Sequence, residues 1–436
     1  MFGRSSTTHL INTYKTALVR GVSPWALKQF LRILPFFIKD DPTKELKALN
    51  FCRRAALRYL HKAYGKDTVW TTIFTPSELL YAMGVTPFPL EVIAAIYASF
   101  GLAPKSLIEA DSQDIPTDVC SLHKLALGCA FRGLLPRPVM LAGNTLLCDS
   151  GIKSMNVCQS ITGKRLVTIN VPLEISEGTV RYVAIQLKHL VEALEDVTGR
   201  GLDMESLQKT FERSNRTRER MLEINDLRIN PASPLKGSSA LNLMLPSHVL
   251  LGTEDGEEFY TRLAQEIKKA ITSGEKFSEV KKADDTIKIL WLEGKHYFSS
   301  ELMPSIEERL GARIVFEEQN YVYWDALDIN NPYESLARKL ISMHWNGPTE
   351  RRLSTIKHLA RNYRADGIIV FSQWGCRRNN AQVPAIKREL EREGFPLLSL
   401  DGDYVDRGNY MPGQFATRIE GFVEMLRGKK KARIAT

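Results

Sequence analysis

The sequence predicts an α/β protein with two Rossmann-like parallel-sheet domains, a helical N-terminal extension and a helical middle segment. Three observations support this fold class. Short apolar runs that suit buried strands alternate with helical patterns in two separate parts of the chain. The stretch between them is rich in Glu, Leu, Arg and Lys at a spacing of ~3.6 residues, as amphipathic helices are. The chain of 436 residues is also long enough for two or three domains.

The N-terminal segment, residues 1–66, is expected to form a helical extension. Its apolar and basic residues alternate at helical spacing, with breaks at Pro24 and Pro35. It holds 13 Lys and Arg against three acidic residues, while residues 427–436 hold five basic residues and no acidic one. The net charge of +9 therefore belongs to the two ends, and the body between them is acidic. A nucleic-acid binder should carry a positive stripe on a folded face, so we expect no nucleic-acid partner.

The first α/β domain is expected over residues 67–180. Thr75-Pro-Ser-Glu78 has the composition of a capping box with Thr75 as N-cap, and Gly84 suits a helix end, so a helix is predicted over 76–83. Apolar patterns and turn residues predict the other elements. These are helices over 90–100 and 121–134 and strands over 139–142 and 167–171.

Residues 181–284 are expected to connect the two sheet domains through helices. Two or more amphipathic helices are predicted over 177–228, and a further helical stretch ends near Thr272. A polar linker, residues 273–285, then leads into the last part of the chain.

The second α/β domain is expected over residues 285–436. Strands and helices alternate there as in parallel βαβ units, and Gly311 and Gly394 stand just past two of the helices. This pattern predicts a doubly wound sheet, whereas the basic tail 429–433 is expected to be a frayed end. The predicted strands are 288–292, 313–316, 367–371 and 396–400, and the predicted helices are 300–310, 354–363 and 381–393.

Motifs that are absent exclude several classes of protein. The longest apolar runs, 33–38 and 92–102, are shorter than the ~20 residues of a membrane-spanning helix, so no membrane span is expected. Residues 1–20 lack the apolar core and cleavage site of a secretory signal, which favours a cytoplasmic location. Neither a Gly-x-Gly-x-x-Gly loop nor a phosphate-binding loop with Gly-Lys-Ser/Thr occurs, so any ATP that this system uses must be bound by a partner.

The six cysteines include no Cys-x-x-Cys pair, and a long cytoplasmic chain does not favour a disulfide framework. Ligands of open α/β sheets bind beyond the carboxyl ends of the strands. Cys148 and Cys376 each follow a predicted strand, and Cys120 precedes a predicted helix. These three could converge across a cleft and hold a four-iron cluster with one iron left open. On spacing alone, buried apolar cysteines are the commoner alternative, and we interpret the other three in that way.

Several motifs between about residue 70 and residue 426 belong together. The most specific are Gly375-Cys-Arg377 after a strand and Gln414-x-x-Thr-Arg-x-Glu-x-Phe422 in the C-terminal helix. The others are PSELLYAMGVTPFP (76–89), DVC (118–120), LCD (147–149) and FPLLSLDGD (395–403). In their order along the chain they resemble the motifs of the 2-hydroxyacyl-CoA dehydratase and benzoyl-CoA reductase family, and in particular a D-component-like subunit of 2-hydroxyglutaryl-CoA dehydratase.

The resemblance implies a subunit that carries one 4Fe-4S cluster, and the positions that match the family's ligands are Cys120, Cys148 and Cys376. In the substrate-binding subunit of such enzymes, the open iron would meet the acyl-CoA. An ATP-driven activator iron-sulfur protein would supply single electrons at very low potential. The thioester would become a ketyl radical anion that loses its 2-hydroxyl and yields an enoyl-CoA, or the ring would be reduced in the benzoyl-CoA branch. A paralogous second subunit is implied as a partner.

Two alternatives to this function stay open. A stand-alone double-cubane reductase of small molecules would need additional cysteines. Residues 341–347 lack the Cys-x-Cys of that branch, although Cys129 and Cys158 keep it under consideration. A non-catalytic scaffold or electron-relay subunit is the second alternative. Residues 1–66 have no counterpart that we identify in the family, and His123 is interpreted as a helix-surface or core histidine.

Two arginines directly follow one of the candidate ligands. Arg377 and Arg378 are candidates for substrate binding, because a guanidinium captures a phosphate or carboxylate such as CoA or a dicarboxylic acyl chain would offer. Pairing with carboxylates at the neighbouring strand end is the structural alternative, and the same carboxylates are also a candidate magnesium site. These carboxylates are Asp401, Asp403 and Asp406.

Overall fold

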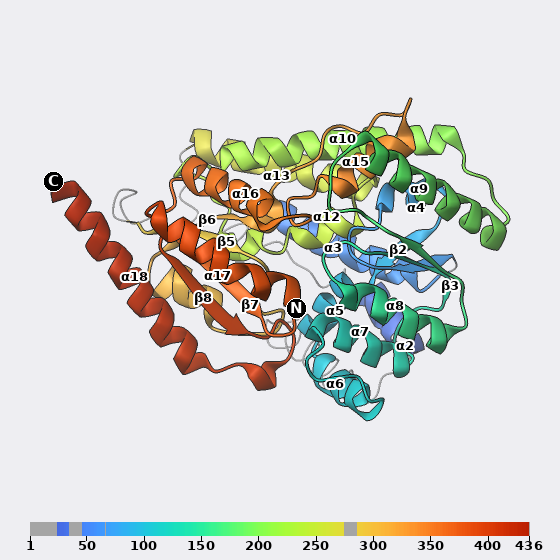
Figure 1. Cartoon of the computed structure of the whole chain (residues 1–436), viewed down its shortest axis with the longest axis horizontal. Helices are drawn as coiled ribbons and strands as arrows, with labels where there is room; N and C mark the ends of the chain where they lie inside the picture. The colour runs from blue at the N-terminus through green and yellow to red at the C-terminus, as the bar shows by residue number, and fades with distance from the viewer. Residues whose placement is uncertain (1–23, 35–45, 66, 274–285, 436) are drawn as a thin grey trace, which may run out of the picture.

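The structure is a computed structural model that describes residues 24–34, 46–65, 67–273 and 286–435. Within these ranges the chain forms two four-stranded parallel sheets that lie beside each other and are flanked by helices (Figure 1). This arrangement confirms the predicted α/β class with two Rossmann-like domains. No helix in the described ranges is long and apolar enough to cross a membrane.

The first sheet has the strand order β2-β1-β3-β4, with all pairs parallel. Its strands β3 (Pro138–Asn144) and β4 (Leu166–Ile169) confirm the two predicted strands. The sequence pattern does not predict β1 (Thr68–Thr71) or β2 (Thr86–Pro89), since each has only four residues. The two prolines of β2 are tolerated because β2 lies at the edge of the sheet, where one side of the strand needs no partner.

The second sheet has the strand order β6-β5-β7-β8, again with all pairs parallel. In both sheets the first strand of the domain lies between the second and the third. The topology therefore reverses between β1 and β3 and between β5 and β7, and open α/β sheets bind ligands at such points. The four predicted strands are confirmed as β5 (Lys288–Leu292), β6 (Arg313–Glu317), β7 (Gly367–Gln373) and β8 (Leu397–Gly402).

Helix α4 (Ser77–Ala82) confirms the short helix predicted in the first domain, but the expected capping box is wrong. Pro76 stands at the N-cap, and no side chain caps the helix. The hydroxyl of Thr75 instead accepts a hydrogen bond from Nδ2 of Asn144 at 3.1 Å, which ties the loop after β1 to the end of β3. The other helices of this domain are α5 (Leu90–Ser99), α6 (Ala103–Ser112), α7 (Ser121–Phe131) and α8 (Asp149–Thr162).

The second domain differs from expectation at three helices. The predicted helix 300–310 is a short α14 (Leu302–Pro304) followed by a π-helical turn, η2 (Ser305–Arg309). Helix α15 (Pro332–Ile341) is not predicted by the pattern. The expectation of a frayed tail is wrong, because α18 continues to Ala435 and Nζ of Lys430 donates to the carbonyl of Thr286 at 3.0 Å. The remaining elements are η3 (Glu318–Asn320), α16 (Thr349–Asn362), α17 (Arg377–Arg392), η4 (Arg407–Asn409) and α18 (Pro412–Ala435).

The middle helices join the two sheet domains. The long helix α10 (Met204–Leu227) runs across both, near the top of the view in Figure 1. Ser214 of α10 donates to Glu78 of α4 at 2.8 Å, and Arg228, just past the end of α10, pairs with Glu317 of β6 at 2.7 Å. The predicted helical character of this region is confirmed by α9 (Glu177–Thr198), α10, α11 (Gly237–Ala240), α12 (Met244–Val249) and α13 (Glu254–Ser273).

The described parts of the N-terminal segment are helical, as expected, and they pack into the body of the protein. They form α2 (Pro24–Ile33) and α3 (Lys47–Ala63). The backbone N–H of Ala48 donates to Glu266 of α13 at 3.1 Å, and Leu60 is fully buried in the main core. The remainder of the segment, including Pro35, lies outside the described residues.

Candidate functional site

The three candidate cysteines occupy the same structural position. Each is the residue immediately before a helix: Cys120 precedes α7, Cys148 precedes α8 and Cys376 precedes α17. The helix that begins at Arg377 starts earlier than the predicted 381, so Cys376 stands at its N-cap. Cys148 and Cys376 also follow β3 and β7, the strands at which the two sheets reverse their order. The structure therefore places all three sulfurs at helix starts, and two of them also lie beyond the ends of strands.

The structure also brings the three thiols into one electrostatic environment. Burial raises the pKa of the Cys120 thiol well above its ordinary value, and the charges of Cys376 and Cys148 raise it further. Burial likewise raises the pKa of Cys148 and of Cys376. The backbone of Gly375 packs against that of Cys120, so the loop after β7 touches the start of α7. Three buried thiolates repel one another, so they can ionise together only beside a cation.

Backbone N–H groups near each sulfur lower the pKa of its thiol and so oppose the effect of burial. Leu122, Gly151 and Asn379, one in the first turn of each helix, lower the pKa of the thiol that precedes them. This is the effect expected of the positive end of a helix on an anion. Burial and the helix starts therefore act in opposite directions on the pKa of each of the three thiols. Within the described residues, no three His, Cys, Asp or Glu side chains gather closely enough to hold a single metal ion.

The three remaining cysteines are interpreted as buried, inert residues, and two of them are fully buried. Cys129 and Cys158 are buried in the main core, as expected, and the Cys129 thiol donates to the Ser106 hydroxyl at 3.4 Å. Cys52 of α3 is half-buried rather than buried. All six cysteines are free thiols.

The side chains of the two candidate arginines, Arg377 and Arg378, lie in different surroundings. The side chain of Arg377 is 77% exposed and pairs with Asp118 at 2.8 Å. The side chain of Arg378 is only 10% exposed, donates to Glu293 at 2.5 Å, and lowers the pKa of Cys376 and of Cys148. Arg378 is therefore the one that faces the cysteines.

Arg378 belongs to a buried network of charges at the end of β5. Glu293, directly after β5, also accepts from Arg352 at 2.8 Å. Arg352 in turn holds Glu318 through two hydrogen bonds of 2.7 and 2.8 Å. The guanidinium of Arg378 lies 5.3 Å from the ring centre of Trp345, and its Nη1 has no hydrogen-bond partner in the described part of the chain. The network holds the Arg378 guanidinium in place near Cys376. Its Nη1 group remains able to donate a hydrogen bond.

The three Asp residues do not take the expected roles. Asp403 accepts from the Ser121 hydroxyl at 2.6 Å, which holds the start of α7 against the end of β8. Asp406 accepts from the backbone N–H of Gly408, and Asp401 lies 3.5 Å from Arg418. None of these contacts reaches the two arginines, and the three carboxylates do not form a metal site among the described residues.

Two further residues lie beside Cys148, and one of them, Glu91, is not singled out by the sequence. Nε2 of His123 lies 4.0 Å from Sγ of Cys148, and its Nδ1 lies 3.8 Å from the Glu91 carboxylate. Glu91 accepts from the backbone N–H of Ile73 at 2.9 Å. Burial raises the pKa of Glu91 to about 7 and lowers the pKa of His123 to about 4. His123 is therefore a core histidine, one of the two expected alternatives, and it lies beside a candidate ligand. A lone carboxylate in the apolar helix α5 is the one sequence signal for Glu91.

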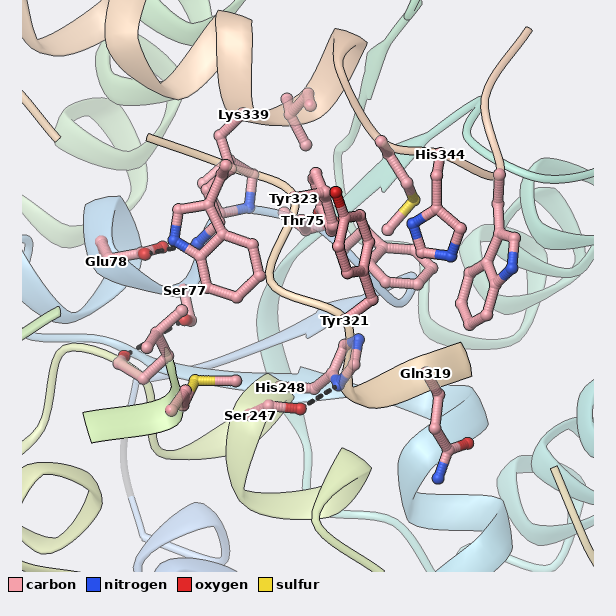
Figure 2. A pocket seen from close by; sticks show the side chains of 18 residues that line it. Thr75, Ser77, Glu78, Ser247, His248, Gln319, Tyr321, Tyr323, Lys339 and His344 are labelled. Atoms are coloured by element: carbon pink, nitrogen blue, oxygen red, sulfur yellow. Dashed lines mark hydrogen bonds and ion pairs between the residues drawn. The ribbon is translucent and has the colours of Figure 1, made fainter. Parts of the chain in front are cut away.

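A cavity of about 60 Å³ lies between the two sheet domains. Its wall comes from the loop after β1, from α10 and α12, from the segment after β6, and from α15 and the residues that follow it. Figure 2 shows Glu78 and Lys339 on one side of Tyr321 and Tyr323, and His344 on the other. Sequence reasoning does not find this cavity, because its residues are scattered along most of the chain.

Comparisons with known proteins identify a family for this fold. The model of the family "2-hydroxyglutaryl-CoA dehydratase, D-component" matches residues 72–426. The chain is 20% identical to the (R)-phenyllactyl-CoA dehydratase alpha subunit of Clostridium sporogenes, over 90% of this chain and 99% of the relative. It is 26% identical to the beta subunit of that enzyme, over 86% of this chain and 95% of the relative.

A relative from the second branch is also similar. The chain is 23% identical to one subunit of the benzoyl-CoA reductase of Thauera aromatica, over 76% of this chain and 82% of the relative. The family match covers the second sheet, the first sheet apart from β1, the middle helices and all three candidate cysteines. The resemblance of the motifs is therefore confirmed, and the chain belongs to the 2-hydroxyglutaryl-CoA dehydratase D-component family.

Proposed function

We propose that this chain is the iron-sulfur subunit of an enzyme that dehydrates or reduces a CoA thioester, most simply a 2-hydroxyacyl-CoA that becomes an enoyl-CoA. The relatives are named as subunits of dehydratases and of a reductase for such thioesters. A 4Fe-4S cluster bound by Cys120, Cys148 and Cys376 is the cofactor of this proposal.

The observation that carries the proposal is the shared position of these three cysteines. Each thiol stands before a helix, and the two nearest to strand ends belong to different domains. A cubane cluster binds each thiolate on a different iron, so its ligands stand further apart than the ligands of one metal ion. The charges of Cys376 and Cys148 both raise the pKa of the Cys120 thiol, which supports a common site for the three sulfurs.

The residues around the cysteines have roles in this function. Backbone N–H groups at the three helix starts and the Arg378 guanidinium stabilise negative charge where the thiolates converge. Glu91 and His123 lie beside Cys148, inside the protein, where water is excluded and a proton can be held close to the site. The cluster, when bound, supplies an iron with an open position and a route for single electrons.

Partners are part of the proposal. The low-potential electrons come from a separate ATP-dependent activator iron-sulfur protein, since this sequence lacks the usual phosphate-binding loops. A paralogous second subunit is proposed because relatives of this chain are named as both alpha and beta subunits of one enzyme. The reaction would take place in the cytoplasm.

Metal analysis after anaerobic purification tests the proposal. We expect a brown protein with about four irons and four sulfides per chain. Replacement of Cys120, Cys148 or Cys376 by Ala should remove the iron, whereas Cys52→Ala, as the matched control, should retain it. A colourless protein after anaerobic reconstitution would overturn the proposal.

The same preparations separate the alternatives. About eight irons per chain would identify a double-cubane reductase instead. A relay or scaffold subunit would hold four irons, but acyl-CoA would leave its cluster spectrum unchanged. In the proposed function, acyl-CoA changes that spectrum.

A further inference from the structure

The cavity between the domains is lined with aromatic rings and buried polar atoms. Phe74, Tyr321, Tyr323 and Trp345 contribute rings, and Figure 2 shows the two tyrosines at its centre. The carboxylate of Glu78 is fully buried and accepts from Nζ of Lys339 at 2.6 Å. Because this ion pair neutralises both charges, the cavity as a whole offers a ligand no net charge.

Three of the lining side chains have polar atoms without a hydrogen-bond partner among the described residues. The atoms without a hydrogen bond are Oε2 of Glu78, both ring nitrogens of His344, and Nε1 of Trp345, although Nε2 of His344 lies 3.7 Å from the Glu318 carboxylate. The carboxylate oxygen can only accept a hydrogen bond, the indole N–H can only donate one, and a neutral imidazole does one of each. Burial lowers the pKa of His344 to about 4, so the imidazole is neutral at pH 7.

This set of atoms complements a group that both donates and accepts hydrogen bonds. A hydroxyl or a carboxamide satisfies that requirement. A carboxylate does not, because it would lie near the Glu78 oxygen and find no free cation among the described lining residues. An apolar group does not either, since the buried donors and acceptors would stay unpaired.

The volume of the cavity limits the size of its ligand. For comparison, an engineered apolar cavity of about 150 Å³ binds benzene. The cavity here is about 60 Å³, so it accommodates a few heavy atoms but no phenyl ring.

Two segments connect the cavity with the surroundings of the cysteines. Trp345 lines the cavity, and its ring centre lies 5.3 Å from the guanidinium of Arg378, two residues after Cys376. Phe74 also lines the cavity, and the N–H of the preceding Ile73 donates to the Glu91 carboxylate at 2.9 Å. A ligand that begins at the cysteines would therefore extend towards these rings.

We propose that this cavity receives the end of the substrate's acyl chain and selects a short chain that ends in a neutral hydroxyl or carboxamide over one that ends in an aryl group. The inference rests on the function proposed above, because it requires an acyl-CoA substrate. The substrate class follows from the lining of the cavity and not from the substrates of the relatives.

Binding of two synthetic thioesters tests the inference. The iron-loaded chain, assembled with its partner subunit, is titrated anaerobically by calorimetry with 2,4-dihydroxybutanoyl-CoA and with 2-hydroxy-3-phenylpropanoyl-CoA. We expect the hydroxyl-ended ester to bind at least about tenfold more tightly, since the phenyl ester must open the cavity and leave buried polar atoms unpaired. Equal or tighter binding of the phenyl ester overturns the inference.

Variants connect the preference to the cavity. Trp345→Phe removes the indole N–H and keeps a ring, so it should lower the preference for the hydroxyl-ended ester about three- to tenfold. Trp25→Phe is the control, because Trp25 is 71% exposed and does not line the cavity; the preference should not change. An unchanged preference in Trp345→Phe also overturns the inference. If that variant does not fold, His344→Asn serves the same purpose.

The two proposals fail in different ways. If the chain holds no cluster and binds neither ester, the proposed function fails and the inference with it. If the chain holds about four irons and prefers the phenyl ester, only the inference about the cavity fails.

Discussion

Gly375 lies directly against the backbone of Cys120, because a Cβ at position 375 would stand 2.5 Å from both the N and the Cα atom of Cys120. Backbone atoms cannot yield to such a contact as a flexible side chain can. The loop after β7 therefore reaches the start of α7 only without a side chain at this position. Since Gly375 precedes Cys376, this contact sets the separation of two cysteines that belong to different domains.

Gly375→Ala should disturb the site far more than an ordinary Gly→Ala change. The added methyl group must push the loop after β7 away from Cys120, so we expect loss of bound iron and a lower melting temperature. Iron analysis and thermal unfolding measure the two effects. Gly421→Ala in α18 is the control, since nothing lies within 4 Å of its Cβ and the helix should gain about 0.5–1 kcal/mol. Retention of iron by Gly375→Ala would contradict the role of this contact.

The ion pair between Arg228 and Glu317 should be essential to the docking of the middle helices. Both side chains are buried and share two hydrogen bonds of 2.7 Å. Arg228→Met leaves the Glu317 carboxylate unpaired in the interior and should cost about 3–5 kcal/mol in the free energy of unfolding, measured with urea. Arg165→Met is the comparison, because its exposed pair with Asp196 should contribute less than about 1 kcal/mol. Equal effects of the two changes would refute the argument.

The protein should lose stability in acid partly through His248. Burial lowers the pKa of His248 to about 4, below the ordinary 6.5. The unfolded chain therefore binds a proton between pH 6.5 and 4 that the folded chain does not. The free energy of unfolding is unaffected above pH 6.5 and falls as the pH drops, by up to about 3 kcal/mol once the pH is below 4. Urea unfolding across this range should show a shallower pH dependence in His248→Gln, and an identical slope would contradict the assignment.

The N-terminal helices should contribute to the stability of the whole protein. Leu60 of α3 is fully buried in the main core, so Leu60→Ala should lower the free energy of unfolding by about 2–5 kcal/mol. Trp25→Ala in α2 is the control, because its side chain is 71% exposed and should contribute within about 0.5 kcal/mol. A neutral Leu60→Ala would show that the segment folds apart from the body.

The second sheet was predictable because three of its strands, β5, β6 and β7, are buried on both faces. Runs such as KILWL (288–292) and GIIVF (367–371) are continuous, and glycines end the neighbouring helices. The strand β2 could not be predicted in this way, because two of its four residues are proline. Only its position at the sheet edge permits them. The capping box at Thr75 fails because Asn144, far along the chain, offers that hydroxyl a better partner.

Only those residues of the candidate site whose position follows from local chain order could be predicted from the sequence. Cys148 and Cys376 follow strands, so the rule for open α/β sheets applies to them from the sequence alone. Their approach to Cys120 depends on how the two domains dock, which no local pattern encodes. The same is true of Glu91, His123 and the cavity around His344, whose chemistry arises from burial that tertiary packing creates.

The three helix starts that hold the cysteines come from both sheet domains, so any group bound to all three also joins the domains. Such a group exists only on the docked arrangement, and its binding free energy adds to the docking free energy. Removal of the group should then divide one cooperative unfolding transition into two, one for each sheet. A cofactor bound there would therefore cross-link the two sheet domains.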